Sequence, residues 1–359
     1  MSDANELISF IASMSGEGNL RVEENLGEGY VRLRVSEAER RQAKHDIQHV
    51  EDIVIEMLRN ARDAGADKVY LATTKEEGVR TLLFLDNGSG VPQDMQERIF
   101  DARVTSKLES MKMDRWGVHG RGMALFSIKQ NTDEARVVTS GVDLGSAFKV
   151  CVATDRLGER ADQSSWPQAV KDEDGRYVCA RGPHNIIRAA CEFALEELRC
   201  CDVYLGSPSE IAATLYAQAS SRLDTSRLLF IDDECELPVI DRLGLASDAE
   251  DFIRICSGLG LEMSERTAHR ILSGQIKPVR GVTARLLRER DSTSHAPAPV
   301  DLAKDRRGLR IAKDDMAQFS RAVERDFNDL AARYYLNLCG DPKIRVSRDR
   351  ITVTFDLAK

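Results

Sequence analysis

The chain has 359 residues, of which 42% are apolar and 31% are charged, a balance typical of a folded, water-soluble protein. A single core stops growing well below this length, so we expect two domains. No stretch approaches the roughly eighteen uninterrupted apolar residues that a membrane helix needs, and MSDANELISFIASMSGEG lacks the features of a signal peptide. The composition predicts no membrane partner and a cytoplasmic location.

The net charge and the cysteines exclude further classes of function. A formal net charge of −8 argues against nucleic-acid binding over the whole surface. The eight cysteines form no C-x-x-C pair and no Cys/His spacing typical of zinc. We therefore expect reduced cysteines that pack mostly as small apolar residues.

The chain begins with a predicted N-terminal arm, residues 1–45, followed by a helix. The arm holds a short amphipathic helix at 7–14 and the alternating run GYVRLRVSE, which favours a strand. The next segment has the apolar spacing of an amphipathic helix that ends near Gly65. Its apolar residues are Val50, Ile53, Val54, Met57, Leu58 and Ala61.

Three polar residues lie beside the apolar stripe of this helix. At about 100° per residue, Glu56, Asn60 and Asp63 fall within roughly 60° of one another. They would face the rim of the core, where a cleft can form. The alternative is a charged helix edge held by local hydrogen bonds.

Two strands, KVYLATT and RTLLFLD, are predicted next, joined by the turn KEEG. The second strand stops at Asp86 and is followed by Gly88 and Gly90. Glycine permits positive φ and a close approach of backbone to a ligand. This strand end is therefore a candidate binding edge.

A polar segment at 101–115 shows no periodicity and is predicted to be a loop. GVHGRGMALFSIKQ then predicts a glycine-rich loop that opens a helix, whose exposed N–H groups suit an anion. Further strands are expected at EARVVTS and SAFKVCVAT. A hydrophilic insert at 155–181 and helices at 185–201 and 209–222 complete a domain that we expect to span 46–224.

The remainder, 225–359, is predicted to be a mainly helical C-terminal domain. It contains a Ser/Pro/Ala-rich linker, DSTSHAPAPV, a helix at 314–338 and a closing strand, KIRVSRDRITVTFDL.

A possible helix-turn-helix lies at 248–278 in this domain. Two helical patterns flank a glycine-containing turn, and Ser264 begins the second. Residues 264–291 hold seven basic and three acidic side chains, a net +4. Candidate DNA contacts are Arg266, His269, Arg270 and Lys277. Many helix pairs show the same pattern for packing alone, and a basic stretch can be a solvated face.

Residues 51–150 resemble the ATP-binding domain shared by gyrase B subunits, Hsp90, histidine kinases and MutL, called the GHKL or Bergerat fold. E-x-x-x-N-A-x-D-A matches the N box, DNGSGV the adenine motif and GVHGRGMALFSI the second glycine box. NARDAGA, DNGSGV and VTSKL look most like MutL, whereas Gly122, where MutL-like chains usually have an acidic residue, looks closer to gyrase B. The resemblance implies an α+β sandwich with helices on one face of a mixed sheet.

The resemblance also implies roles for the N box and the adenine motif. Asn60 would hold Mg²⁺ through its side-chain oxygen, and Asp63 completes the motif. Glu56, without an Arg or Lys to compensate its charge, would orient and deprotonate the attacking water. Asp86 would accept a hydrogen bond from the adenine amino group, while Gly88 and Gly90 let the base lie close.

The resemblance places the phosphates at the second glycine box. The residues implied there are Gly117, Val118, His119, Gly120, Arg121, Gly122 and Met123. Lys107 would add a catalytic point charge from the lid piece VTSKL, which includes Thr105 and Ser106. Ser146 occupies the place where the family often has a hydroxyl near adenine. Beyond Val150 neither the usual transducer domain nor its catalytic lysine is found.

We therefore expect a Mg·ATP-dependent conformational switch that hydrolyses ATP and acts on duplex DNA, on a protein partner or as a homodimer. The competing interpretation is an ATP-binding interaction module that hydrolyses little or nothing. Glu56 favours hydrolysis, whereas the missing transducer lysine favours the module.

Overall fold

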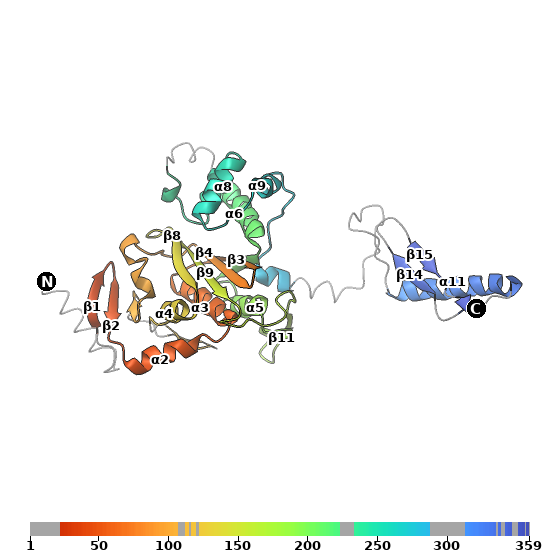
Figure 1. Ribbon diagram of the computed structural model, residues 1–359, viewed down its shortest axis with the longest axis horizontal. Coiled ribbons are helices and arrows are strands. Elements are labelled where there is room, and N and C mark those ends of the chain that lie inside the picture. The colour runs from red at the N-terminus through yellow and green to blue at the C-terminus, as the bar shows by residue number, and fades with distance from the viewer. Residues whose placement is uncertain are drawn as a thin grey trace. The chain divides into compact units, whose positions relative to one another are not determined.

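The computed structural model divides the chain into two compact units, residues 1–290 and 291–359 (Figure 1). The structure describes residues 22–106, 112–114, 116–119, 122–222, 233–287, 313–334, 337–338, 342–346, 351–355 and 357–358. The predicted helix at 7–14 and the linker at 291–300 lie outside these residues.

A five-stranded mixed sheet forms the centre of the first unit. Its strands, in spatial order, are β12 (Asp202–Gly206), β3 (Lys68–Glu76), β4 (Val79–Asp86), β9 (Ser146–Ala153) and β8 (Glu134–Ser140). β12 pairs with β3 in parallel, and the other neighbours are antiparallel. The four strands predicted between residues 68 and 154 are therefore confirmed.

The central strand β4 is buried on both of its faces. Side chains alternate along a strand, so Leu82 and Phe84 enter one core while Leu83 and Leu85 enter the other. This explains the unbroken apolar run LLFL, because a strand with one solvated face alternates apolar and polar residues.

Three helices cover the first face of the sheet (Figure 1). They are α3 (Val50–Asp63), α4 (Ala124–Asn131) and α5 (Ile186–Glu196). The apolar residues predicted for α3 are buried, and the helix ends at Asp63, with Ala64 as its C-cap and Gly65 next at a φ of +76°. The packing of this stripe leaves Glu56 and Asn60 at the margin of the core, as predicted.

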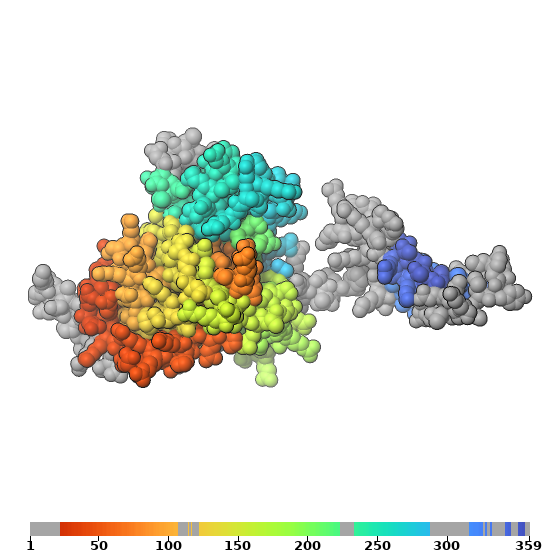
Figure 2. Space-filling model, viewed as in Figure 1, coloured from red at the N-terminus to blue at the C-terminus, as the bar shows by residue number. Residues whose placement is uncertain are grey.

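A second layer of helices covers the opposite face. It consists of α6 (Pro208–Arg222), α8 (Ala249–Gly258) and α9 (Glu265–Leu272). Phe252 and Leu259 share one core with Tyr70 and Leu85 of the sheet. Figure 2 shows the α8–α9 segment, in cyan, lying directly against the strand segments in yellow.

The fold class is confirmed, with a mixed sheet flanked by helices and a helical C-terminal part, but helices cover both faces of the sheet rather than one. The domain boundary expected near Asp224 does not coincide with the boundary between the compact units, which lies at 290–291. The physical reason is that residues 239–276 pack their apolar side chains on the second face. An apolar sheet face must pack against another element, and this segment covers it.

The described part of the N-terminal arm also belongs to the first unit. β1 (Val22–Gly27) and β2 (Tyr30–Leu33) form a hairpin, and α2 (Glu37–Asp46) follows a capping box at Ser36. β2 pairs with β5 (Val104–Thr105). The strand expected from GYVRLRVSE therefore ends at Leu33, because Ser36 already caps a helix.

Several short elements complete this unit. They are the 3₁₀ turns η1 (Gln93–Met95), η2 (Arg98–Phe100), η3 (Glu234–Glu236) and η4 (Arg242–Leu245), and the hairpins β6 (Lys112–Asp114) with β7 (Gly117–His119) and β10 (Gln168–Lys171) with β11 (Tyr177–Arg181). β5 and β6 therefore lie in the segment predicted to be a loop.

The second unit contains α11 (Lys313–Tyr334) and two antiparallel pairs, β13 (Asn337–Leu338) with β16 (Leu357–Ala358) and β14 (Lys343–Val346) with β15 (Ile351–Thr354). The helix expected at 314–338 ends at Tyr334, and the closing run is folded back on itself rather than being one strand.

Two broad expectations can be compared with the described residues. None of the described helices is both long and apolar enough to span a membrane. The seven described cysteines are all free, and four of them are buried.

Phe252→Ala is expected to lower the free energy of unfolding by about 3–5 kcal/mol, because this ring fills the core of the second face. Trp116 and Trp166 pack against the core of the first face. Their fluorescence therefore measures unfolding of the face that Phe252 does not contact. If both faces unfold together, the midpoint of the fluorescence-detected unfolding transition will move to a lower urea concentration.

The matched control is Phe319→Ala, which removes a phenylalanine that is 38% exposed in the second unit. We expect a change within about 0.5 kcal/mol. An unshifted fluorescence transition in Phe252→Ala would contradict the shared core.

Candidate nucleotide-binding site

A cavity of about 540 Å³ lies beside α3, α4 and the adjoining ends of β4 and β9. Ten of the predicted site residues line it, although they come from distant parts of the sequence. They are Glu56, Asn60, Asp63, Asp86, Gly90, Thr105, Ser106, Gly122, Met123 and Ser146. The fold thus brings the N box, the adenine motif and the start of the glycine-box helix to one cavity.

The other predicted residues are placed differently. Gly88 is buried and is not among the described lining residues. Gly117, Val118 and His119 form β7, and their predicted contact with phosphate stays a prediction. Lys107, Gly120 and Arg121 lie outside the described residues.

One end of the cavity is formed by Asp86 and Ser146, which face each other across the β4–β9 pair. Asp86 is only 4% exposed, and its Oδ1 accepts a hydrogen bond from the Gly88 backbone N–H at 2.8 Å. The Ser146 hydroxyl lies 3.0 Å from that of Ser140. A carboxylate that is almost fully buried at a strand end can recognise an N–H donor through a strong, charge-assisted hydrogen bond.

Two glycines allow the backbone to close around this cavity. Gly90 has a φ of +71°, and a Cβ at this position would lie 1.8 Å from the Gly141 carbonyl oxygen. Gly122 has a φ of +67°, and a Cβ there would lie 2.9 Å from the Val104 carbonyl oxygen. Glycine is therefore required at both positions for conformation and for space.

Another part of the wall is the N-terminus of α4, together with Gly122 and Met123. Met123 occupies the N-cap position, and no side chain caps the helix. The first N–H groups of a helix have no partner within it, so this end suits an anion.

Two polar side-chain atoms on the wall have no hydrogen-bond partner among the described residues. They are Asn60 Nδ2 and Ser127 Oγ, both buried. Leaving such an atom unpaired costs about 1–3 kcal/mol, which a polar ligand in the cavity would offset.

The electrostatic surroundings of α3 correct one prediction. Glu56 was expected to lack a compensating cation, but its Oε1 lies 2.6 Å from Arg59 NH1 on the same helix. Arg59 is 3% exposed, so this is a largely buried ion pair. Glu56 and Arg59 are three residues apart, a spacing that places two side chains next to each other on one face of a helix, so the sequence contained the signal for this pair.

The second predicted carboxylate is paired as well. Asp63 Oδ1 lies 3.0 Å from the Arg62 side chain, which also contacts Glu197. Burial lowers the pKa of Arg62, but its hydrogen bonds to Glu197, Asp63 and Asp114 outweigh burial and raise it. Arg62 therefore stays charged, and Asp63 lines the cavity as one partner of an ion pair.

Comparison with known proteins supports this reading of the cavity. Residues 47–148 match the family described as histidine kinase-, DNA gyrase B-, and HSP90-like ATPase. The matched segment contains α3, β4 and α4, which carry the N box, the adenine motif and the helix of the glycine box. This segment belongs to the GHKL superfamily.

Within the superfamily the GHKL segment is similar to MutL. It is 34% identical over 112 residues to the DNA mismatch repair protein MutL of Brucella abortus (strain S19), a match that covers 31% of this chain and 18% of that protein. MutL of Thermodesulfovibrio yellowstonii is 31% identical over 107 residues, covering 29% of this chain and 19% of the relative. The chain thus spans less than a fifth of the length of these relatives.

The cavity of the GHKL segment is completed by residues that lie outside the match. Tyr30, Gln42 and Asp46 of the N-terminal arm line it. Burial raises the pKa of Tyr30, while a hydrogen bond with the Ser106 side chain acts in the opposite direction. The sequence predicted the strand that carries Tyr30 but did not predict that this strand pairs with β5.

Asn60 on the cavity wall has a side chain that suits a Mg²⁺ ion. Among the described residues no group of three or more His, Cys, Asp or Glu side chains could hold a metal ion. Asn60 offers an amide oxygen, the hard ligand that Mg²⁺ accepts. Asn60 would hold Mg²⁺ together with phosphate oxygens.

The predicted DNA contacts lie elsewhere, on α9 and the turn after it. α8 and α9 pack together as the predicted helix pair, with Ala268 and Ile271 buried. Arg266, Arg270 and Lys277 are exposed, as is the fourth candidate, His269. These side chains are therefore outside the core and accessible to a partner.

Asp86→Asn is expected to weaken ATP binding about tenfold or more, because the amide would present a donor where the carboxylate accepts, and losing a charged hydrogen bond costs about 1.5–3 kcal/mol. Asparagine can still accept from the Gly88 N–H, so the turn should survive. Titration calorimetry with ATP measures the effect, and an unchanged Kd would refute the adenine assignment.

Proposed function

We propose that the first unit binds Mg·ATP in this cavity and hydrolyses it, and that the nucleotide drives a conformational switch. The observation that carries the proposal is the convergence of Glu56, Asn60, Asp86 and the uncapped N-terminus of α4 on one cavity. The membership of residues 47–148 in the GHKL superfamily supports it.

In this proposal the two ends of the cavity recognise different parts of ATP. Asp86 accepts a hydrogen bond from the adenine amino group, with Ser146 beside it. Gly122, Met123 and the first N–H groups of α4 bind phosphate oxygens. Mg²⁺ held at Asn60 would neutralise charge on the phosphates.

Glu56 acts on water in the proposed reaction. Its carboxylate takes a proton from a water molecule as the water oxygen attacks the γ-phosphorus. The bond between that phosphorus and the bridging oxygen breaks, and ADP leaves with the electron pair. The products are ADP and inorganic phosphate.

We propose duplex DNA as the partner of the switch. Two observations support DNA over a purely protein partner: the exposed basic side chains of α9, and the similarity of the GHKL segment to proteins that are named for DNA mismatch repair. α9 packs on the second face of the sheet whose first face forms the cavity wall, so both sites belong to one compact unit. Homodimerisation and a cytoplasmic location stay predictions.

A second candidate function is an ATP-binding module with little or no turnover. One observation favours it: Glu56 is paired with the buried guanidinium of Arg59. A cation next to a carboxylate favours its ionised form and weakens it as a base.

Glu56→Gln is expected to lower kcat by roughly 10²-fold while the Kd for ATP stays within about twofold, because Glu56 acts on water rather than on binding. Glutamine keeps the length of the side chain and an oxygen for Arg59. Turnover is measured with and without duplex DNA. A parent protein that turns over no ATP in either condition would establish the module instead.

Changing Arg266, Arg270 and Lys277 together to Ala should weaken duplex binding and reduce the slope of log K against log[salt] by about 0.9 for each DNA phosphate that the protein no longer neutralises. Fluorescence anisotropy over a salt series measures both quantities. The fold and ATP affinity should be retained, since all three side chains are exposed.

The control removes the same charge from another surface, with Lys171, Arg176 and Arg181 of the β10–β11 hairpin changed to Ala. All three are exposed. Equal losses of affinity in the two triple variants would show a general charge effect and no DNA site on α9.

A further inference from the structure

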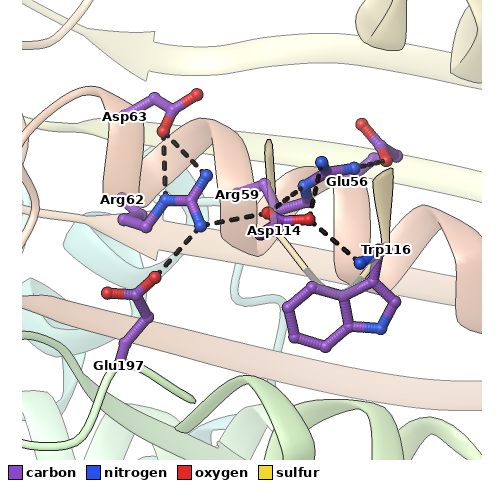
Figure 3. Close-up of polar contacts among 7 residues, drawn as sticks. All are labelled: Glu56, Arg59, Arg62, Asp63, Asp114, Trp116 and Glu197. Atoms are coloured by element: carbon purple, nitrogen blue, oxygen red, sulfur yellow. Dashed lines mark hydrogen bonds and ion pairs between the residues drawn. The ribbon is translucent and has the colours of Figure 1, made fainter. Parts of the chain in front are cut away.

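An ion-pair network joins α3 to the β6–β7 hairpin beside the cavity, which Arg59 and Trp116 help to line (Figure 3). Arg59 NH1 lies 2.6 Å from Glu56 Oε1, while Arg59 Nε and NH2 donate to the two carboxylate oxygens of Asp114 at 2.9 and 3.0 Å. Asp114 ends β6, 55 residues away in sequence. One buried guanidinium thus connects the proposed base to the hairpin.

The network also fixes the carboxylate of Asp114 from other directions. The backbone N–H of Trp116 donates to its Oδ1 at 3.0 Å, and Arg62 NH1 lies 3.2 Å from its Oδ2. Asp114 is 9% exposed. Charge-assisted and bidentate bonds of this kind are the geometrically specific ones, so Asp114 holds the Arg59 fork in one orientation.

The charges of the network show what Asp114 does for Glu56. Among the residues drawn in Figure 3, Arg59 and Arg62 pair with the carboxylates of Glu56, Asp63, Asp114 and Glu197. Asp114 occupies Nε and NH2 of Arg59, and Glu56 is reached through NH1. Without the charge of Asp114, the positive charge of Arg59 would act more strongly on Glu56, which would become a weaker base.

We propose that Arg59 and Asp114 are positioning residues for Glu56. Arg59 orients the carboxylate toward the cavity, and Asp114 draws the guanidinium away so that Glu56 remains able to accept a proton. This inference rests on the proposed role of Glu56 in hydrolysis and deepens that role. It makes ATP turnover depend on the position of the β6–β7 hairpin relative to α3.

The test is Asp114→Asn, which keeps the size of the side chain and an acceptor for the Trp116 N–H but removes the charge. We expect kcat to fall by at least about fivefold while the Kd for ATP, from calorimetry, changes by less than about twofold. Arg59→Lys, which cannot form the bidentate pair, should lower kcat in the same sense.

The matched control is Glu159→Gln. Glu159 is also 9% exposed, accepts two bonds from one guanidinium, that of Arg80, and has a second basic partner in Lys75. It does not line the cavity. Glu159→Gln should lower the free energy of unfolding in urea about as much as Asp114→Asn does, while its kcat stays within about twofold of the parent value. This comparison separates loss of a buried ion pair from loss of positioning.

A double-mutant cycle shows whether Asp114 acts through Glu56. In a Glu56→Gln background, Asp114→Asn should have almost no further effect on kcat, measured with enzyme in excess over ATP. If the residual turnover of Glu56→Gln is below detection, the comparison of kcat between Asp114→Asn and Glu159→Gln alone decides whether Asp114 has a positioning role.

Each contrary outcome has a distinct meaning. Unchanged kcat in Asp114→Asn, an equal loss in Glu159→Gln, or an equal loss in the Glu56→Gln background would overturn the positioning role alone. A parent without turnover, or a Glu56→Gln variant with normal turnover, would instead overturn the proposed function and the inference with it.

Discussion

The burial of β4 on both faces is the constraint on which the rest of the first unit depends. Phe84 is covered by the first-face helices, and Leu83 and Leu85 by the second-face layer. A strand held from both sides cannot slip by one residue without turning its whole apolar set to the wrong core. Asp86 directly follows these side chains, so its position in the cavity is set by packing rather than by the loop after it.

A second constraint is electrostatic and concerns the α3 side of the cavity. Buried ion pairs add little net stability, but removing one partner leaves an uncompensated charge and is strongly destabilising. Arg59 and Arg62, each with acidic partners on different elements, therefore tie α3, β6 and the end of α5 into a fixed arrangement. The same arrangement decides how much positive charge Glu56 experiences.

The sequence predicted what is encoded by neighbours along the chain. The N box is one helical turn, so Glu56 and Asn60 could be placed on one face from helical periodicity, and the strand ending at Asp86 from its apolar run. The contact of Arg59 with Glu56 is equally local, but the N-box pattern specifies the residues at i and i+4 and leaves i+3 open, so the pattern does not predict it.

What the sequence could not predict are contacts between distant segments. Asp114 meets Arg59 across 55 residues, and Tyr30 lies at the cavity on β2, which pairs with the distant β5. The compact units divide at 290–291 rather than near Asp224 for a related reason: a helical pattern shows that a helix has an apolar face but not which surface covers it. Here the second sheet face covers it.

The close contacts around Gly90 give the proposed switch a physical route to the second-face helices. The backbones of Gly90 and Gly141 leave no room for a Cβ between them, and Asp143 N–H donates to the Ser89 carbonyl at 2.7 Å. In the same loop the Leu144 carbonyl accepts from Val239 N–H at 2.8 Å, and Val239 belongs to the core of the second face. Packed interiors transmit displacement because they have no free volume in which to absorb it. A nucleotide that moves the Gly90 turn must therefore also move the 141–145 loop and, through it, the layer that carries α9.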